Sequence, residues 1–345
     1  MTTIITRTII AAAIITGIAT HAKAQTQPFW YGADISGATE LEARGWQLYN
    51  AQGEPRECVE LMSELGMNAV RLRVWVNPKD SLCSPNDMLK LALRAKQHGM
   101  AVMVDFHYAD SWADPNQQPI PQAWQGLKYK DLRKAFYQHT LSTLQLLREN
   151  NVDVKWVQVG NETTHGFLWD VARAETNMKN YADLTRLGYK AVKKVYPQAQ
   201  VIVHLDAAAD PERYNFIFDN LRRHHTPYDV IGMSVYPYWD IKAGITTSWQ
   251  ETVRRMTLNI RRVALKYNKH VIITETGTEA AYPEQGKQIM QAIITAARDS
   301  TNQQCNGVFY WAPEAEGAYP LGAFQNHRPT QILTPFTTEA KRYNR

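Results

Sequence analysis

Cysteine is scarce in this chain of 345 residues, since Cys58, Cys83 and Cys305 are its only three. The sequence contains no CxxC pair and no Cys/His cluster, so the usual patterns of a metal site are absent. An odd number allows at most one disulfide within the chain, and a Cys58–Cys83 pair is sterically conceivable. A chain of this length can bury a large core, so its fold has no need of disulfides.

Long hydrophobic runs are missing beyond the N-terminus. Arg7 precedes an apolar stretch at residues 9–18, and Ala-Lys-Ala at 22–24 offers a small-x-small cleavage site. This pattern is typical of a secretory signal peptide and is too short to cross a bilayer as a mature helix. We predict a signal peptide at residues 1–24 and an exported protein, periplasmic or extracellular, with no membrane span. No cysteine follows the cleavage site, so a lipid anchor there is not expected.

Strong charge, linkers and phosphate-binding glycines are missing as well. The formal charge is +5, and the densest basic run, at 222–225, reads as a solvated helix end, so we expect no nucleic-acid partner. No Pro/Gly/Ser-rich linker or repeat divides the chain, which predicts one domain over residues 25–345. We also expect a monomer. No glycine-rich turn follows the first predicted strand, which counts against nucleotide-binding folds.

Short apolar segments and longer amphipathic segments alternate along the chain. The predicted strands are 29–35, 68–75, 101–107, 154–161, 200–205, 229–235, 270–275 and 306–311. The predicted helices are 55–65, 86–98, 131–149, 178–195, 211–224, 247–267 and 284–299, with possible starts at Pro55, Pro85, Pro211 and Pro283 and possible ends at Gly66 and Gly99. This alternation favours an α/β fold, a (β/α)8 TIM barrel, over an open doubly wound sheet.

Two glutamates stand at the ends of predicted strands. Glu162 closes the fourth and Glu275 the seventh. A buried carboxylate is costly unless it is paired, so two in matching positions suggest a catalytic cleft rather than two unrelated salt bridges. Glycoside hydrolysis uses such a pair, one carboxylic acid to protonate the leaving oxygen and one carboxylate to attack or to activate water.

Several motifs carry a family resemblance over essentially the whole mature chain. They are Tyr-Gly-Ala-Asp-Ile-Ser at 31–36, Asn-Ala-Val-Arg-Leu-Arg-Val-Trp-Val-Asn-Pro at 68–78, Asp-Phe-His-Tyr-Ala-Asp-Ser-Trp-Ala-Asp-Pro at 105–115, Gln-Val-Gly-Asn-Glu at 158–162, Gly-Met-Ser-Val-Tyr-Pro-Tyr-Trp at 232–239 and Thr-Glu-Thr-Gly at 274–277. With these motifs the chain resembles glycoside hydrolase family 53, the endo-β-1,4-galactanases, within the clan of retaining (β/α)8 glycosidases.

The resemblance implies roles for several residues. Glu162 would be the general acid/base and Glu275 the nucleophile. Asn161 would bind the 2-hydroxyl of the sugar next to the scissile bond, and Tyr236 would hydrogen-bond the nucleophile. The clan's arginine aligns with Arg71, which shares a strand face with Arg73 and could supply positive charge near the nucleophile.

Other candidate substrate contacts come from inward positions and from strand ends. Asp105 and His107 face inward by alternation, and His107 is expected next to the cleavage point. Trp112, Trp239 and Trp311 lie near strand ends, where a sugar face can stack on an indole ring. Trp30, Trp75 and Trp124 can equally be core residues.

The predicted function is an exported retaining endo-β-1,4-galactanase acting on type I arabinogalactan, with polysaccharide as its only partner. Some relatives hold calcium with a long loop after strand seven, but residues 277–283 lead almost directly into a helix. We therefore expect no metal and no cofactor. A mannanase or cellulase of the same clan is the first alternative, and an inactive carbohydrate-binding barrel is the second.

Overall fold

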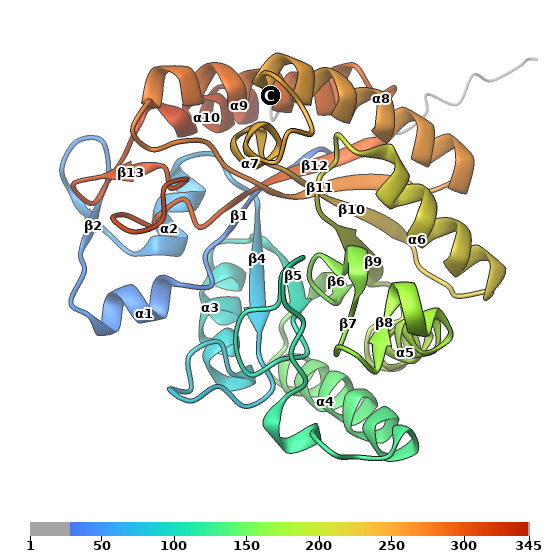
Figure 1. The fold of residues 1–345 in the computed structure, drawn as a ribbon. Coiled ribbons are helices and arrows are strands. Elements are labelled where there is room, and N and C mark those ends of the chain that lie inside the picture. The colour runs from blue at the N-terminus through green and yellow to red at the C-terminus, as the bar shows by residue number, and fades with distance from the viewer. Residues whose placement is uncertain (1–27, 344–345) are drawn as a thin grey trace, which may run out of the picture.

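The computed structural model describes residues 28–343 and contains a closed barrel of eight parallel strands. The predicted signal peptide lies outside the described residues. The barrel strands are β1 (Trp30–Asp34), β4 (Ala69–Val74), β5 (Ala101–Phe106), β6 (Val154–Val159), β9 (Gln200–Leu205), β10 (Val230–Val235), β11 (His270–Thr276) and β12 (Cys305–Trp311). Each pairs with the next in this order, and β12 closes on β1 (Figure 1). The predicted TIM barrel and its eight strands are confirmed.

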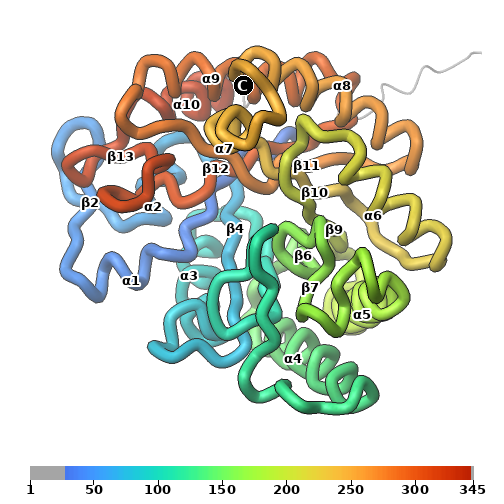
Figure 2. The backbone as a smooth tube through the Cα atoms, viewed as in Figure 1, coloured from blue at the N-terminus to red at the C-terminus, as the bar shows by residue number. Residues whose placement is uncertain are grey.

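Helices surround the barrel and cover the outer face of its sheet (Figures 1 and 2). They are α2 (Cys58–Glu64), α3 (Pro85–Gln97), α4 (Tyr129–Glu149), α5 (Ala174–Val195), α6 (Pro211–Arg223), α8 (Trp249–Tyr267), α9 (Pro283–Asp299) and α10 (Thr334–Tyr343). The first seven correspond to the predicted helices, whereas α10 was not predicted. It brings Phe336 into the core beside Tyr31 of β1, with ring centroids 6.4 Å apart.

The helix ends follow the local sequence signals with one exception. Pro85, Pro211 and Pro283 occupy the first turns of α3, α6 and α9, where a missing N–H is tolerated. The predicted helix start at Pro55 is wrong. This residue lies in a short hairpin instead, and α2 begins at Cys58 because the Glu57 side chain caps it by accepting from the backbone N–H of Glu60.

Short hairpins and helices lie in the connections between the barrel strands and the surrounding helices. Three two-stranded hairpins are formed by β2 (Leu48–Tyr49) with β3 (Pro55–Arg56), β7 (Gly166–Phe167) with β8 (Ala172–Arg173), and β13 (Phe324–Gln325) with β14 (Arg328–Pro329). Further short helices are α1 (Ala38–Ala43), α7 (Pro237–Lys242), η1 (Gln122–Trp124), η2 (Thr163–His165) and η3 (Gln331–Leu333). None of the helices between residues 28 and 343 is long and apolar enough to cross a membrane.

The barrel interior has an apolar floor. It is formed by the inward side chains of Ala69, Met103, Trp156, Ile202, Val230, Ile272 and Phe309. The ring of Phe309 lies against β1 at Gly32, where an added Cβ would come within 2.2 Å of Cδ1 of that ring. The floor is therefore close-packed, and Gly32 leaves the space that the aromatic ring fills.

A polar layer lies directly above this floor. Two residues further along four of the strands, the inward positions hold Arg71, Asp105, Gln158 and His204, and on β10 Ser234 stands four residues beyond Val230; all five are buried. This layer stands at the carboxyl ends of the strands, the end of a TIM barrel where active sites form. Buried polar groups must be paired, so the layer is expected to be a hydrogen-bonded network.

Candidate active site

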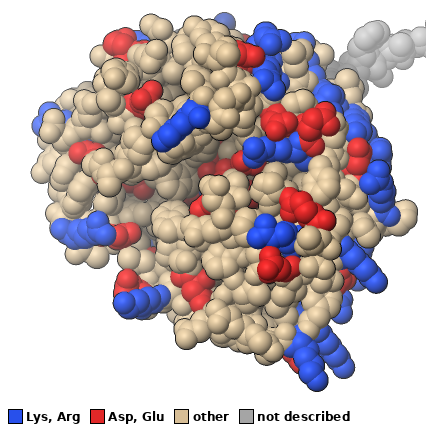
Figure 3. All heavy atoms as spheres, viewed as in Figure 1, with Lys and Arg blue, Asp and Glu red and all other residues tan. Residues whose placement is uncertain are grey.

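A cavity of about 770 Å³ opens over the polar layer. Figure 3 shows a hollow in this face, with acidic atoms visible inside it. The predicted residues that line the cavity are His107, Trp112, Asn161, Glu162, Tyr236, Trp239, Glu275 and Trp311. Arg71 and Asp105, also predicted to bind substrate, are fully buried beneath it and do not line it. In this structure their direct contacts are with other site residues.

A β-bulge aims Glu275 into the barrel. Ile272 points inward and Ile273 outward, so strict alternation would turn Thr274 inward and Glu275 outward. The register with β10 shifts here, because Met233 pairs with Ile273 while Ser234 pairs with Glu275. The extra residue in β11 reverses the alternation, as a bulge does, and directs the carboxylate into the cavity.

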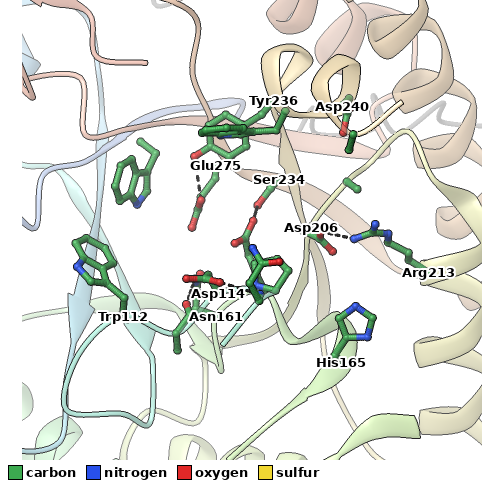
Figure 4. A pocket seen from close by; sticks show the side chains of 18 of the residues that line it. Trp112, Asp114, Asn161, His165, Asp206, Arg213, Ser234, Tyr236, Asp240 and Glu275 are labelled. Carbon is green, nitrogen blue, oxygen red and sulfur yellow. Dashed lines mark hydrogen bonds and ion pairs between the residues drawn. The ribbon is translucent and has the colours of Figure 1, made fainter. Parts of the chain in front are cut away.

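Glu275 is held by one cation and one hydroxyl. Its Oε1 lies 2.8 Å from Nη2 of Arg71. Its Oε2 accepts a hydrogen bond of 2.9 Å from the Tyr236 hydroxyl (Figure 4). Burial raises the pKa of Glu275 to about 7, against the lowering effects of Arg71 and Tyr236. Both contacts stabilise the ionised carboxylate.

Arg71 is the central cation of the buried network. Its guanidinium contacts Asp34 at 2.6 Å and Asp105 at 2.9 Å as well as Glu275. It also donates to Oε1 of Gln158 at 2.6 Å and to Oδ1 of Asn161 at 2.8 Å. The three carboxylates raise the pKa of Arg71 against the lowering effect of burial, so the guanidinium stays charged.

Asp105 connects this network to His107. Nε2 of His107 lies 2.9 Å from Asp105 Oδ2, and its Nδ1 accepts from the backbone N–H of Ala113 at 3.2 Å. Against the upward effect of burial, Arg71 and His107 lower the pKa of Asp105 to about 2. Burial lowers the pKa of His107, so a neutral imidazole, with its orientation held by Asp105, faces the cavity.

Glu162 follows a tight turn at the end of β6. Gly160 has φ of +95°, and Glu162 itself has the left-handed backbone of φ 43° and ψ 53°. A left-handed non-glycine residue is uncommon and costs energy, and such residues concentrate at functional sites. The turn presents the carboxyl group of Glu162 to the cavity, where it stays partly exposed.

A hydroxyl and an imidazole support the Glu162 carboxyl group. The Ser234 hydroxyl donates to Glu162 Oε1 at 2.5 Å, and Nε2 of His204 lies 2.8 Å from the Ser234 oxygen. The Nδ1 atom of His204 lies near two donors, the Gln158 amide at 3.0 Å and the Glu162 backbone N–H at 3.3 Å. It also lies 3.1 Å from Oδ1 of Asn161, which already accepts from Arg71. We therefore assign the proton of His204 to Nε2, which makes a relay from His204 through Ser234 to Glu162.

The two carboxyl groups differ in their nearest charges. Burial, then the negative charges of Glu275 and Asp206, raises the pKa of Glu162 well above its usual value, whereas the Ser234 hydroxyl and the more distant Arg71 lower it. Glu275 has the Arg71 guanidinium in direct contact. Glu275 therefore ionises first, while Glu162 keeps its proton to higher pH.

Aromatic side chains form one wall of the cavity. Trp112 is 43% exposed and lies 5.8 Å, centroid to centroid, from Trp311, which in turn contacts Tyr319 at 4.7 Å. The guanidinium of Arg73 packs 4.1 Å from the Trp112 ring centroid and so supports it from behind. We name the rings of Trp112, Trp311 and Tyr319 the aromatic wall.

Sequence reasoning did not identify several residues of this site. Ser234 lies within the quoted 232–239 motif, and His204 occupies an inward position of a predicted strand, so both could have been found by alternation. Asp206 at the end of β9, Arg213 on α6 and Asp240 on α7 also line the cavity. No sequence pattern linked these three, because they come together only when the connections after two strands fold over the barrel.

Within residues 28–343, neither the cysteines nor the side chains that usually bind metals form a disulfide or a metal site. All three cysteines are buried and free. Within residues 28–343, no group of three or more His, Cys, Asp or Glu side chains is arranged to hold a metal ion. The expected absence of calcium stays a prediction.

The chain has relatives among known protein families and sequences. Residues 30–320 match the model of glycosyl hydrolase family 53. An endo-β-1,4-galactanase of Bacillus subtilis strain 168 is 32% identical over 320 residues, which cover 84% of this chain and 71% of that protein.

Solved structures agree with this match. A fungal β-1,4-galactanase superposes with a TM-score of 0.80 at 25% identity, covering 90% of this chain and 99% of that one. The family 53 catalytic domain of Ignisphaera aggregans superposes with a TM-score of 0.80 at 27% identity, covering 89% and 95%.

Proposed function

The chain belongs to glycosyl hydrolase family 53 and is therefore a glycoside hydrolase, and from this premise we propose that it is a retaining endo-β-1,4-galactanase. Its substrate is β-1,4-galactan of the type I arabinogalactan kind. Similarity to the B. subtilis and fungal galactanases supports this substrate. The observation that carries the mechanism is the difference in the surroundings of the two carboxyl groups. Of the two, only Glu275 directly contacts a guanidinium.

The reaction proceeds in two displacements. Ionised Glu275 attacks the anomeric carbon while protonated Glu162 donates its proton to the leaving glycosidic oxygen. The covalent glycosyl–enzyme is then hydrolysed by water, from which Glu162, now ionised, removes a proton. Two inversions at the same carbon retain its configuration.

Neighbouring residues position these two groups and the sugar. Arg71 and Tyr236 keep Glu275 ionised and oriented, and Asp105 orients His107 toward the sugar at the cleavage point. Asn161 donates one amide N–H to the Ala113 carbonyl at 2.8 Å. Because a primary amide has two N–H bonds, the second is available to the 2-hydroxyl of the sugar.

The aromatic wall stacks against the sugars on the Glu275 side of the scissile bond. Pyranose rings present C–H groups that pack on indole faces, which buries area with little loss of side-chain freedom. Trp239, 41% exposed at the rim, is a further stacking surface. The protein acts as a monomer without metal or cofactor, and a signal peptide at residues 1–24 exports it to the periplasm or the medium.

The test is reducing-sugar release with product sizing on β-1,4-galactan, mannan and cellulose, with Glu275→Ala as the inactive control. We expect short galacto-oligosaccharides from galactan alone. Activity on mannan or cellulose with none on galactan would refute the substrate. Binding of galactan without hydrolysis, equal in the two proteins, would favour an inactive carbohydrate-binding barrel.

A further inference from the structure

The cavity continues well beyond the two glutamates on the side of Glu162. Its aromatic wall lies on the side of Glu275, whereas the opposite end is lined by Asp206, Arg213 and Asp240, with Lys242 and Ile245 beside them. In Figure 4, Trp112 lies on one side of Glu275 and Ser234, and Asp206, Arg213 and Asp240 lie on the other. We name Asp206, Arg213 and Asp240 the charged end of the cavity.

The proposed chemistry determines which half of the substrate reaches the charged end. An acid that protonates the leaving oxygen must stand beside the leaving half, while the nucleophile stands beneath the half that stays bound. With Glu162 as acid, the leaving half extends from Glu162 away from Glu275. That direction leads to the charged end.

Hydrogen bonds and ion pairs hold the charged end in place. Asp206 accepts a hydrogen bond from the Thr164 hydroxyl and forms an ion pair with Nη1 of Arg213. The Nε atom of Arg213 is fixed from outside the cavity by Asp210 at 3.2 Å. Two carboxylates thus hold the guanidinium at the cavity wall, which lowers the entropic cost of hydrogen bonding to a ligand.

Asp240 gives the most specific indication that a ligand binds at the charged end. It is only 3% exposed and lines the cavity, yet its Oδ2 has no hydrogen-bond partner among residues 28–343. Burial, then the negative charge of Asp206, raises the pKa of Asp240 to about 7. A buried carboxyl oxygen without a donor is unfavourable and rare, so its retention next to a cavity points to a ligand that supplies the donor.

We propose that Asp240 and Arg213 bind hydroxyl groups of the galactosyl unit that leaves, and therefore also of the sugar that can act as acceptor. This assignment rests on the proposed function and on Glu162 as its acid. Neutral sugar hydroxyls both donate and accept, so one unit can donate to the Asp240 carboxyl group and accept from the Arg213 guanidinium. Recognition at this end uses charged hydrogen bonds, in contrast to the stacking on the aromatic wall.

The test compares two substrates that share the retained half and differ in the leaving half. The leaving group from β-1,4-galactan is a sugar. The leaving group from a nitrophenyl β-1,4-galactobioside is a phenol, which has no sugar hydroxyl groups for Asp240 to bind. We expect Asp240→Ala to lower kcat/KM on galactan about tenfold, as is typical when a hydrogen bond to a charged group is lost. On the nitrophenyl substrate the same variant changes kcat/KM less than twofold.

Two further variants make the comparison specific. Arg213→Lys keeps a cation beside Asp206 but loses the planar fork, and we expect the same selective loss on galactan. Glu212→Gln is the matched control, because it removes an exposed carboxylate of the same helix, whose side chain contacts Asn215 and does not line the cavity. We expect this variant to leave kcat/KM on both substrates unchanged.

Transfer reactions give an independent readout. A retaining enzyme passes the covalent glycosyl group to an added acceptor sugar as well as to water, and the acceptor binds where the leaving sugar was. With nitrophenyl galactobioside as donor and galactobiose as acceptor, we expect Asp240→Ala to lower the ratio of transfer to hydrolysis about tenfold.

The outcomes separate this inference from the proposed function. Equal losses on both substrates, or no loss on galactan with an unchanged transfer ratio, would overturn the assignment of the charged end while wild-type activity on galactan upholds the function. Wild-type protein without activity on galactan would overturn both. If Asp240→Ala does not fold, as judged by its thermal transition, Arg213→Lys carries the same comparison.

Discussion

Removal of the Ser234 hydroxyl should change the acid in a predictable direction. The Ser234 hydroxyl donates to Glu162 Oε1 at 2.5 Å, and this bond is best made to the ionised carboxylate. It therefore lowers the pKa of Glu162, although burial and nearby negative charge keep the net shift upward. Ser234→Ala removes the stabilisation of the ionised form, so the pKa of Glu162 must rise further.

The size of this shift follows from the strength of the hydrogen bond. A hydrogen bond to a charged group contributes about 1.5–3 kcal/mol. One pKa unit corresponds to about 1.4 kcal/mol, and water from the cavity replaces part of the lost bond. We expect the pKa of Glu162 to rise by about one unit.

The assay is the dependence of kcat/KM on pH with galactan as substrate. In the proposed mechanism Glu275 must be ionised and Glu162 protonated, so the acidic limb reports Glu275 and the alkaline limb reports Glu162. Ser234→Ala should move the alkaline limb upward by about one unit and leave the acidic limb in place. Lower activity at the optimum is also expected, because the acid loses its orientation.

Tyr236→Phe is the matched control at the other carboxylate. It removes the hydroxyl that donates to Glu275 at 2.9 Å, so the pKa of Glu275 rises and the acidic limb moves upward while the alkaline limb stays. The two variants must therefore move opposite limbs. If Ser234→Ala moves the acidic limb, or lowers the alkaline one, the division of roles between the two glutamates is wrong.

Four further predictions address the mechanism, the barrel and the metal. Glu275→Ala should lower kcat on galactan about a thousandfold or more while galactan binding, followed by calorimetry, persists; substantial turnover would place the nucleophile elsewhere. Glu162→Ala should impair galactan far more than a nitrophenyl galactobioside, because a phenol needs little protonation to leave, and equal losses would contradict its role as acid. Gly32→Ala should destabilise the barrel by about 1–3 kcal/mol, because its Cβ would overlap the Phe309 ring; Gly37→Ala, whose Cβ meets Glu314 Oε1 at an ordinary 3.6 Å, is the control in thermal unfolding. Chelator treatment should change neither activity nor the melting temperature, whereas tightly held calcium found by elemental analysis would refute the expectation of a metal-free protein.

Much of the fold could be predicted from sequence because hydrophobic alternation and turn residues act locally. All eight barrel strands and seven of the helices follow from segment composition. Strands buried on both faces are apolar throughout, and surface helices repeat apolar residues along one face at the helical period. The missed helix α10 is short and follows an irregular segment, and its place is determined by contacts of Phe336 with the core. The misplaced start at Pro55 has a similar cause, because a proline is equally acceptable in a short hairpin strand.

For the site as well, sequence could identify some residues but not how they are oriented. Glu162 and Glu275 could be identified from their positions at strand ends, and the family from long motifs around them. The inward direction of Glu275, however, depends on a bulge between Ile273 and Glu275 that pairing with β10 creates. Strict alternation would have turned this side chain out of the barrel.

Tertiary structure alone decided which groups act together. Arg71 serves three carboxylates from different strands, and Ser234 and His204 support Glu162 across the barrel. Asp240, Arg213 and Asp206 meet at one end of the cavity although they come from two connections, one after β9 and one after β10. Sequence by itself determined which residues are apolar, which turns form and where the carboxylates stand along the strands, because these depend on neighbours within a few residues. Closure of the barrel determined the charges that each carboxylate meets, because those charges arrive from distant strands and through space.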